Sequence, residues 1–513
     1  MSKKTHEELM HDMVGPLAEV YRVEHKGNHK RPVTRREMLG QGMLTGATFV
    51  AMPSVIELVF DYLNVNRAYG VEASQCTAPG AAGGVAPFLQ IEPAGGCMMA
   101  GDFVFGKQGP GAPVEFLAQT GYATIGWDAT AHPSAVAPNM EFGAPFHKNS
   151  PLLAGLKAAM SPAAIAKTAV VGVANATQDD TGNNPLGTTH LAIKSTANKG
   201  QLVQIAGSSA TPNGGRSAVN PIGQDASLSR ALVQSSASLA ALVDPGVLGS
   251  LLGGPEGADK VAKAAMAMSE KKLAMFKAKD LPSQVQTLVS CGYLGSSDLI
   301  TKFSATSLDP AADTKITGVG ADNLPLFNTA VAEEQKAAAI VKLLIDGNAA
   351  AGAIEKGGYD YHAQGLATTN QKQTVLGRAA GAYLEAAHRA GKPAFLVITT
   401  DGATSAGAAG ANGQTAPQAD SGSRGASIIL AIGATARPPM AFNQIGAFND
   451  GGAVNLTQGV HANSPANASL VIAANYAQFA GKYDQFGKNL AASGAQNPFA
   501  GKEAEYLAFK KPG

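Results

Sequence analysis

Residues 357–362 read GGYDYH, and the pattern that predicts the fold begins with them. We interpret them as an extended segment, and a helical pattern follows at 371–390. An apolar run at 394–399 comes next, and after a loop rich in Gly, Ala and Ser a second apolar run covers 427–432. This order of strand, helix, strand, loop and strand is typical of open α/β sheets, which place their sites at strand ends.

Outside this region the same pattern continues. Short apolar runs at 88–91, 168–173 and 202–206 predict further strands, the second of them buried on both faces. A helical pattern at 330–345 has an apolar stripe opposite a charged one. Strands that alternate with such helices favour an α/β fold with a mostly parallel sheet and helices on both faces. The mostly helical stretch 226–290 predicts a helical insertion in that domain.

The composition argues against some functions. Charged residues make up 15% of the 513 residues and the net charge is +1, so the chain has no strong field to attract nucleic acid. We therefore expect no nucleic-acid partner.

The cysteines Cys76, Cys97 and Cys291 are too few for a disulfide framework and form no C-x-x-C spacing. One disulfide with a spare thiol, or buried free thiols, are both compatible with this pattern.

The N-terminal region has the features of an export signal. Arg35 and Arg36 precede a moderately apolar run, 43–60, that a proline and a glutamate interrupt. A membrane span needs about 20 apolar residues, so this run is a weak one. The pattern predicts a twin-arginine signal with a candidate cleavage point at 69–73, and the alternative is an amphipathic helix with a basic start. We expect 1–76 to be a leader and signal or anchor region with membrane contact.

Residues 77–513 are then expected to form the main α/β domain, located in the periplasm or outside the cell. This part of the sequence contains no P-loop, no G-x-S-x-G elbow, no H-E-x-x-H and no G-x-G-x-x-G opening a helix. The chemistry that remains comes from carboxylates and histidines near predicted strand ends, which are ligands for divalent metals. These candidates are Asp102, His190, Asp360, His362, Asp401, Asp420 and His461.

Asp360 and His362 stand out among the candidates. They are two positions apart, so in an extended segment both side chains point to one face and Tyr361 points to the other. Asp401 closes the strand after the next helix, and parallel strands end at the same sheet edge. We therefore expect Asp401 to converge with the pair. The alternative is that Asp360 caps a turn, His362 packs under the helix and Asp401 is solvated.

The order of these elements resembles a family of bacterial exported proteins related to alkaline phosphatases and sulfatases. The matching features are the arginine pair, Gly95-Gly96 at the end of a strand, His190, GGYDYH and Asp401. The resemblance covers residue 34 to the C-terminus in element order, and it is specific only at the signal and at 357–362. It implies an alkaline-phosphatase-like fold and a metal centre built from a G-G-x-D-x-H segment, an acidic Gly-rich turn and an Asp-His pair.

The chain departs from this family in its expected metal ligands. Asp102 is displaced from Gly95-Gly96, Asp401 begins DGATS where the family has Glu-Phe-Gly-Arg-Thr, and Asp420-Ser421 replaces the Asp-His pair. A serine cannot replace imidazole as a ligand for a softer metal, so the resemblance implies at most one divalent ion (zinc, manganese, calcium or magnesium). The expected ligands are Asp360, His362, Asp401, Asp420, Asp102 and His190.

Two functions follow from this reading. The first is a binding or structural/assembly protein with an eroded metal centre, which has an unknown protein partner or assembles with itself. The uncharged Gly/Ala/Asn-rich loop 402–413 favours it. The second is a metal-dependent phosphate or sulfate ester hydrolase that uses a hydroxyl of Thr188, Thr189 or Ser421.

Overall fold

The computed structural model describes one part of the chain. The described residues are 85–109, 114–177, 183–184, 186–218, 224–225, 228–243, 305–362, 364–492 and 494–512. The predictions for the leader, the twin-arginine signal, its cleavage point and most of the helical lobe lie outside these residues, as do Cys76 and Cys291. Cys97 is described, and it is buried with a free thiol.

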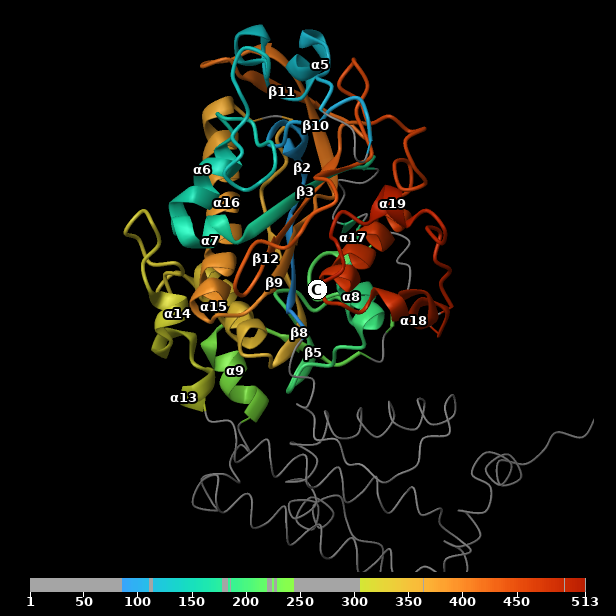
Figure 1. The fold of residues 1–513 in the computed structure, drawn as a ribbon. Coiled ribbons are helices and arrows are strands. Elements are labelled where there is room, and N and C mark those ends of the chain that lie inside the picture. Colours follow the sequence, from blue (N-terminus) through green and yellow to red (C-terminus); the bar gives the residue numbers. More distant parts are fainter. Residues whose placement is uncertain are drawn as a thin grey trace, which may run out of the picture. The chain divides into compact units, whose positions relative to one another are not determined.

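An eight-stranded sheet forms the centre of the fold, in the order β13-β3-β12-β9-β1-β8-β5-β7 (Figure 1). Its strands are β1 (Phe88–Pro93), β3 (Thr168–Ala174), β5 (Val203–Gly207), β7 (Arg230–Leu232), β8 (Ala349–Lys356), β9 (Ala394–Ile398), β12 (Ala426–Ile432) and β13 (Gln444–Ile445). Within this sheet only β12 runs antiparallel to its neighbours. The predicted mostly parallel α/β sheet is confirmed, and its four predicted central strands are β1, β3, β9 and β12.

Helices lie on both faces of this sheet. The helices of the described residues are α5 (Gln119–Thr124), α6 (Pro151–Ala159), α7 (Pro162–Ala166), α8 (Thr189–Thr196), α9 (Ser236–Val243), α13 (Ala305–Leu308), α14 (Thr314–Thr317), α15 (Ala332–Ile345), α16 (Leu366–Arg389), α17 (Pro465–Phe479), α18 (Phe486–Ala492) and α19 (Glu503–Tyr506). In Figure 1, α6, α7, α15 and α16 cover one face, and α8, α17 and α18 cover the other.

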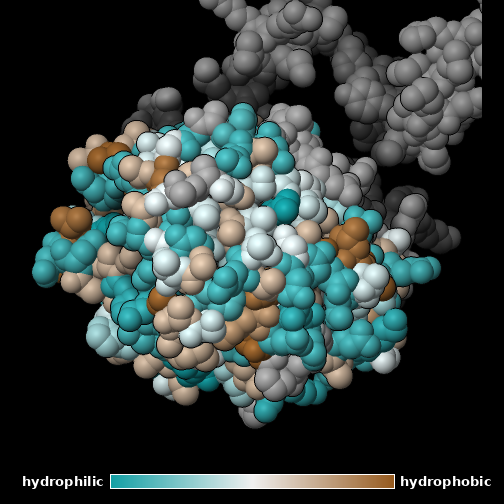
Figure 2. Space-filling model, turned by 90° about the horizontal axis from the view of Figure 1, so that it is seen from above, coloured by the Kyte–Doolittle hydropathy of each residue, from teal (hydrophilic) through white to brown (hydrophobic). Residues whose placement is uncertain are grey.

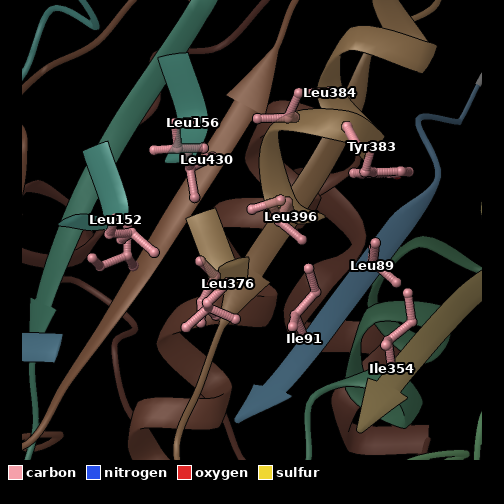
Figure 3. Packing of buried hydrophobic residues seen from close by; sticks show 14 of the residues in the cluster. Leu89, Ile91, Leu152, Leu156, Ile354, Leu376, Tyr383, Leu384, Leu396 and Leu430 are labelled. Carbon is pink, nitrogen blue, oxygen red and sulfur yellow. The ribbon is translucent and has the colours of Figure 1, made fainter. Parts of the chain in front are cut away.

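Strand β1 shows how the two faces are filled. All six of its residues are buried, and it pairs in parallel with β8 on one side and β9 on the other. Leu89 belongs to the apolar cluster that contains Leu376 of α16, which Figure 3 shows from close by. Phe88 points the other way and packs edge-on against Tyr476 of α17. A strand buried on both faces needs a continuous apolar run, which is the pattern that predicted it.

Strand β8 lies at a different place from the strand expected here. Residues 357–362 were predicted to be extended in the sheet, but the strand is Ala349–Lys356, immediately before them. Its sequence is AAAGAIEK, which has little of the β-branched character that marks a strand. The first six residues are buried between β1 and β5, so packing and pairing override the weak local preference.

Two further expectations are corrected. The predicted loop 402–413 contains strand β10 (Gly402–Ala409), which pairs with β11 (Thr415–Asp420) and with β2 (Gly96–Cys97) in a three-stranded sheet. In the predicted helical stretch from residue 226, residues 230–232 form β7, and the helix α9 begins only at Ser236.

The end of the molecule that carries β10, β11 and α5 is the face seen from above in Figure 2. Among its described residues, polar and weakly polar groups dominate, and hydrophobic residues form separate spots. Within the described ranges we find no helix with the length and hydrophobicity of a membrane span.

Candidate metal centre

The segment between β8 and α16 is held against the strand that follows β1. Tyr359 N donates to Ala94 O at 2.8 Å, and Tyr361 N donates to Gly96 O at 3.1 Å. Both tyrosine side chains are buried, and Tyr361 Oη donates to Gln373 Oε1 at 2.8 Å. The residues that alternate with the tyrosines, Asp360 and His362, point outward. The predicted alternation is therefore present, although it occurs in a loop rather than in a strand.

Gly95 makes this close approach compatible with the backbone. A Cβ atom at Gly95 would lie 2.3 Å from Asp360 N, and the residue has a φ of +109°. Both conditions exclude other residues, since side chains rarely occupy this region of φ and a contact of 2.3 Å is far inside van der Waals distance. The strand ending in two glycines thus lets the Asp360 backbone pass over it.

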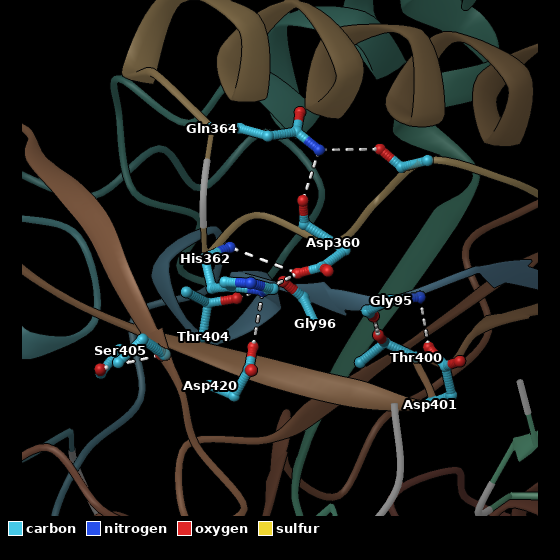
Figure 4. A network of polar contacts seen from close by, with 12 residues as sticks. Gly95, Gly96, Asp360, His362, Gln364, Thr400, Asp401, Thr404, Ser405 and Asp420 are labelled. Carbon is cyan, nitrogen blue, oxygen red and sulfur yellow. Dashed lines mark hydrogen bonds and ion pairs between the residues drawn. The ribbon is translucent and has the colours of Figure 1, made fainter. Parts of the chain in front are cut away.

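Asp360, His362 and Asp420 form a group that we call the triad (Figure 4). One potential ligand atom from each lies within 4.8 Å of the other two. His362 Nδ1 contacts Asp360 Oδ1 and lies 3.2 Å from Asp420 Oδ1. Two ligands bound to one ion at about 2.0–2.6 Å can be at most about 4–5 Å apart, so the spacing fits a single divalent ion.

Asp420 reaches the triad through the β10–β11 hairpin. It is the last residue of β11, and its Cα partner in β10 is Thr404. Thr404 Oγ1 donates to Gly96 O, the same carbonyl that accepts from Tyr361 N. Both chain segments that carry the triad, 357–362 and the β10–β11 hairpin, are therefore hydrogen-bonded to the carbonyl of Gly96.

The backbone that carries Asp360 is held further by α16 and the residues just before it. Gln364 Nε2 donates to Asp360 O and, at 3.3 Å, to Gly358 O. Lys372 Nζ donates to Gly358 O and, at 2.8 Å, to Gln364 Oε1. These contacts fix the turn around Gly358 without using the side chains of Asp360 or His362.

Asp401, which was expected to join Asp360 and His362, is engaged elsewhere. Its carboxylate is fully buried; Oδ1 accepts from Gly95 N at 2.6 Å and Oδ2 lies 2.9 Å from Arg216 Nη2. Asp401 is not a member of the triad, and Asp420 takes the third position. Its contact with Gly95 nevertheless places it beside the glycine that the Asp360 backbone passes over (Figure 4).

Asp102 is also buried away from the triad. Its Oδ1 accepts from Ser150 Oγ at 2.6 Å and from Leu152 N at 3.4 Å, and its Oδ2 accepts from Gln373 Nε2. Ser150 is the N-cap of α6, so Asp102 sits at the start of that helix. Burial raises the pKa of the Asp102 carboxyl to about 7, although the hydrogen bonds from Ser150 and Gln373 act in the opposite direction.

His190 uses both of its ring nitrogens within the fold. Nδ1 accepts from Asp225 N at 2.7 Å, so Nε2 carries the proton and donates to Pro212 O at 2.8 Å. Neither nitrogen then has a lone pair to offer a metal. Burial lowers the pKa of His190, and that of His461 to about 4. His461 packs edge-on against Tyr506 and is likewise not part of the triad.

The sequence interpretation missed a second polar group at the same sheet edge. Glu92 near the end of β1 and Glu355 near the end of β8 are register partners, and Arg216 lies beside both. The signal was present in the run FLQIEP, where Gln90 and Glu92 alternate with apolar residues in a fully buried strand. Two polar side chains on one face of such a strand indicate a buried polar network.

The three hydroxyl groups considered for catalysis also differ in whether they are buried in the fold or lie near the triad. Thr188 Oγ1 donates to the buried Gln90 Oε1, and Thr189 Oγ1 donates to Asn213 O at 3.0 Å. Both threonines are fully buried. Ser421 follows Asp420 directly, and its Oγ accepts from Arg424 Nη1 at 3.1 Å. Ser421 is thus the only one of the three beside the triad.

Comparisons of this chain with protein-family models, with curated proteins and with solved structures find no match.

Proposed function

We propose that the protein is an exported binding or assembly protein on an alkaline-phosphatase-like α/β scaffold, and that it holds one divalent metal at the triad. The proposal of export depends on the Arg35-Arg36 pair of the sequence. The triad carries the metal proposal, because it places two carboxylates and one imidazole within reach of a single ion. The mostly parallel sheet is compatible with the proposed scaffold.

The donor set favours a particular range of metals. Carboxylate oxygens bind hard divalent ions, and an imidazole nitrogen adds affinity for zinc or manganese over calcium or magnesium. The side chains of His362, Asp360 and Asp420 are 40%, 45% and 48% exposed. An ion held there would keep coordination positions open to solvent, where a carboxylate or imidazole of a partner protein could bind. This openness supports a binding role for the metal.

The alternative is a metal-dependent phosphate or sulfate ester hydrolase. One observation favours it: Ser421 and Arg424 lie next to Asp420, so a hydroxyl and a guanidinium adjoin the triad. In that function a metal would supply Lewis-acid stabilisation of the ester oxygens. Ser421 would then act as nucleophile, and Arg424 would bind the anion.

Titration calorimetry of the full chain with Zn²⁺ and Mn²⁺ tests the metal proposal. We expect one ion per chain, and we expect His362→Ala and Asp420→Asn each to weaken binding at least about tenfold, since each removes a ligand. Asp484→Asn is the matched control, because Asp484 is an exposed aspartate paired with Lys511 far from the triad in sequence. Absence of binding, or equal affinity in all variants, would refute the metal site.

The same preparations separate the two functions. A metal-loaded binding protein should leave aryl phosphate and aryl sulfate esters unhydrolysed. Turnover that requires both His362 and Ser421 would instead establish the hydrolase. Turnover that survives Ser421→Ala and His362→Ala would come from a contaminant and support neither.

A further inference from the structure

The segment 211–218, which follows β5, lies against the carboxyl ends of the central strands. Glu92 and Glu355 are register partners on β1 and β8, and Asp401 follows β9, the other neighbour of β1. Three acidic side chains therefore end three adjacent strands. We call Glu92, Glu355 and Asp401 the edge acids. This group is separate from the triad and includes none of its members.

Arg216 connects the segment to all three edge acids. Its backbone N donates to Glu92 Oε2 at 2.7 Å, and its Nη1 donates to Glu355 Oε1 at 3.2 Å. Its Nη2 lies 2.9 Å from Asp401 Oδ2. Glu92 and Asp401 are fully buried, while the side chains of Arg216 and Glu355 are 13% and 34% exposed. One cation thus stands among three acids in a largely buried setting, where unbalanced charge is costly.

The fit around Glu92 is tight and leaves one oxygen without a donor. A Cβ atom at Gly215 would lie 1.8 Å from Glu92 Oε2, so only glycine allows the segment to approach. Among the described residues, the buried Glu92 Oε1 has no hydrogen-bond partner. An ionised Glu92 would therefore be a buried carboxylate with one oxygen bonded to Arg216 N and the other without a donor, beside two further carboxylates.

We propose that Glu92 and Arg216 form a pH-sensitive lock: the segment 211–218 stays docked while Glu92 is protonated and detaches when Glu92 ionises. The physical cause is the charge balance around Arg216. With Glu92 neutral, the guanidinium faces the two carboxylates of Glu355 and Asp401. Ionisation adds a third negative charge and no cation, and undocking the segment lets water solvate it.

The charged groups around Glu92 set the pH of release. Burial is the main cause that raises its pKa to about 8; Glu355 on β8 and Asp401 after β9 act in the same direction, and the Arg216 N–H and guanidinium oppose them. Because the folded-state pKa lies above the unfolded value of 4.5, the folded protein keeps this proton longer. Its contribution to stability is full below about pH 4.5 and is lost as pH rises toward about 8.

Trypsin reports on the lock directly, since it cleaves after Arg216. We expect the Arg216–Ser217 bond of the full-length protein to be protected at pH 7 and cleaved at pH 9. A group with a pKa of about 8 goes from about one tenth to about nine tenths ionised over this interval, so the rate should rise up to about ninefold. Rates are normalised to hydrolysis of a small arginine ester, which corrects for the protease itself.

Two variants decide whether Glu92 is the cause. Glu92→Gln keeps the shape and cannot ionise, so cleavage at pH 9 should stay as slow as at pH 7. Glu355→Gln retains Glu92, and the rise in its cleavage rate should persist. A wild type protected at pH 9, or a Glu92→Gln variant that is cleaved like the wild type, would overturn the lock.

Hydrogen exchange of the wild type gives a second test that needs no variant. After correction for the intrinsic rate, exchange in 211–218 should accelerate between pH 7 and pH 9 while α15 keeps its protection. Equal protection of 211–218 at both pH values would overturn the lock, and so would simultaneous loss of protection in α15, because that would be global unfolding.

Discussion

The triad and the edge acids both place carboxylates where strands end, but they differ in burial. The triad side chains are 40–48% exposed, whereas the edge acids Glu92 and Asp401 are fully buried and Glu355 is 34% exposed. Water solvates exposed carboxylates, so two of them can lie close together at little cost in free energy and can bind a ligand such as a metal ion. Buried ones must be balanced by Arg216 or keep a proton. The same residue type at the same kind of position thus has two physical roles.

The two groups are joined at Gly95. Asp401 Oδ1 accepts from Gly95 N, and Gly95 leaves room for the Asp360 backbone. The buried group therefore supports the surface on which the exposed group is built. Mutations should show this as an asymmetry: changes in the buried group should affect stability, and changes in the triad should affect metal binding.

Arg216→Ala should have the largest effect. Removing one partner of a buried ion pair leaves uncompensated charge and typically costs about 3–5 kcal/mol. We expect a loss of this size in the free energy of unfolding at pH 7, measured by denaturant titration. His362→Ala, measured without metal, should change it by less than about 0.5 kcal/mol, as is usual at the surface. Equal losses of unfolding free energy in the two variants would show that the buried group contributes no more to stability than the exposed triad.

Gly95→Ala should have the next largest effect and should act on both groups. Strain at a positive φ costs of order 1–3 kcal/mol, and the clash with Asp360 N adds displacement of the 357–362 segment. We therefore expect lower stability together with weaker zinc binding. Gly357→Ala is the matched control, because nothing lies within 4 Å of its Cβ position and its φ is not positive. Unchanged metal affinity in Gly95→Ala would break the proposed link.

A further contrast, between two buried acids, concerns the dependence of stability on pH. Burial raises the pKa of Asp102 from 3.8 to about 7, so the folded state retains its proton and stability falls as pH rises through that interval. Asp102→Asn should remove a slope of about 1.4 kcal/mol per pH unit. The slope is measured by denaturant titration at several pH values.

Glu92→Gln provides the contrast to Asp102→Asn. Between pH 7 and pH 8 the folded protein loses the Asp102 proton before the Glu92 proton, so Glu92→Gln should lower the slope there by more than Asp102→Asn does. If both variants keep the wild-type slope from pH 4.5 to pH 8, neither buried carboxyl binds its proton as tightly as its burial indicates.

The elements that could be predicted from the sequence are those whose signal is local. The apolar runs that became β1, β9 and β12 and the stripe that became α16 were readable, because a strand or helix buried in this way must repeat its apolar residues at a fixed period. The proximity of Asp360 and His362 was also readable, since alternation is a property of the chain over three residues. Strand β8 could not be predicted, because alanine has little intrinsic preference for a β-strand.

Which distant groups meet depends on the three-dimensional packing of the chain. Asp420 joins the triad because the β10–β11 hairpin pairs with the segment after β1, and Asp401 is removed from it because Arg216 is delivered by the segment after β5. Both contacts connect residues far apart in sequence. Sheet order and burial set them, and no local period contains that information, since it is the charge balance of the packed interior that assigns each carboxylate its role.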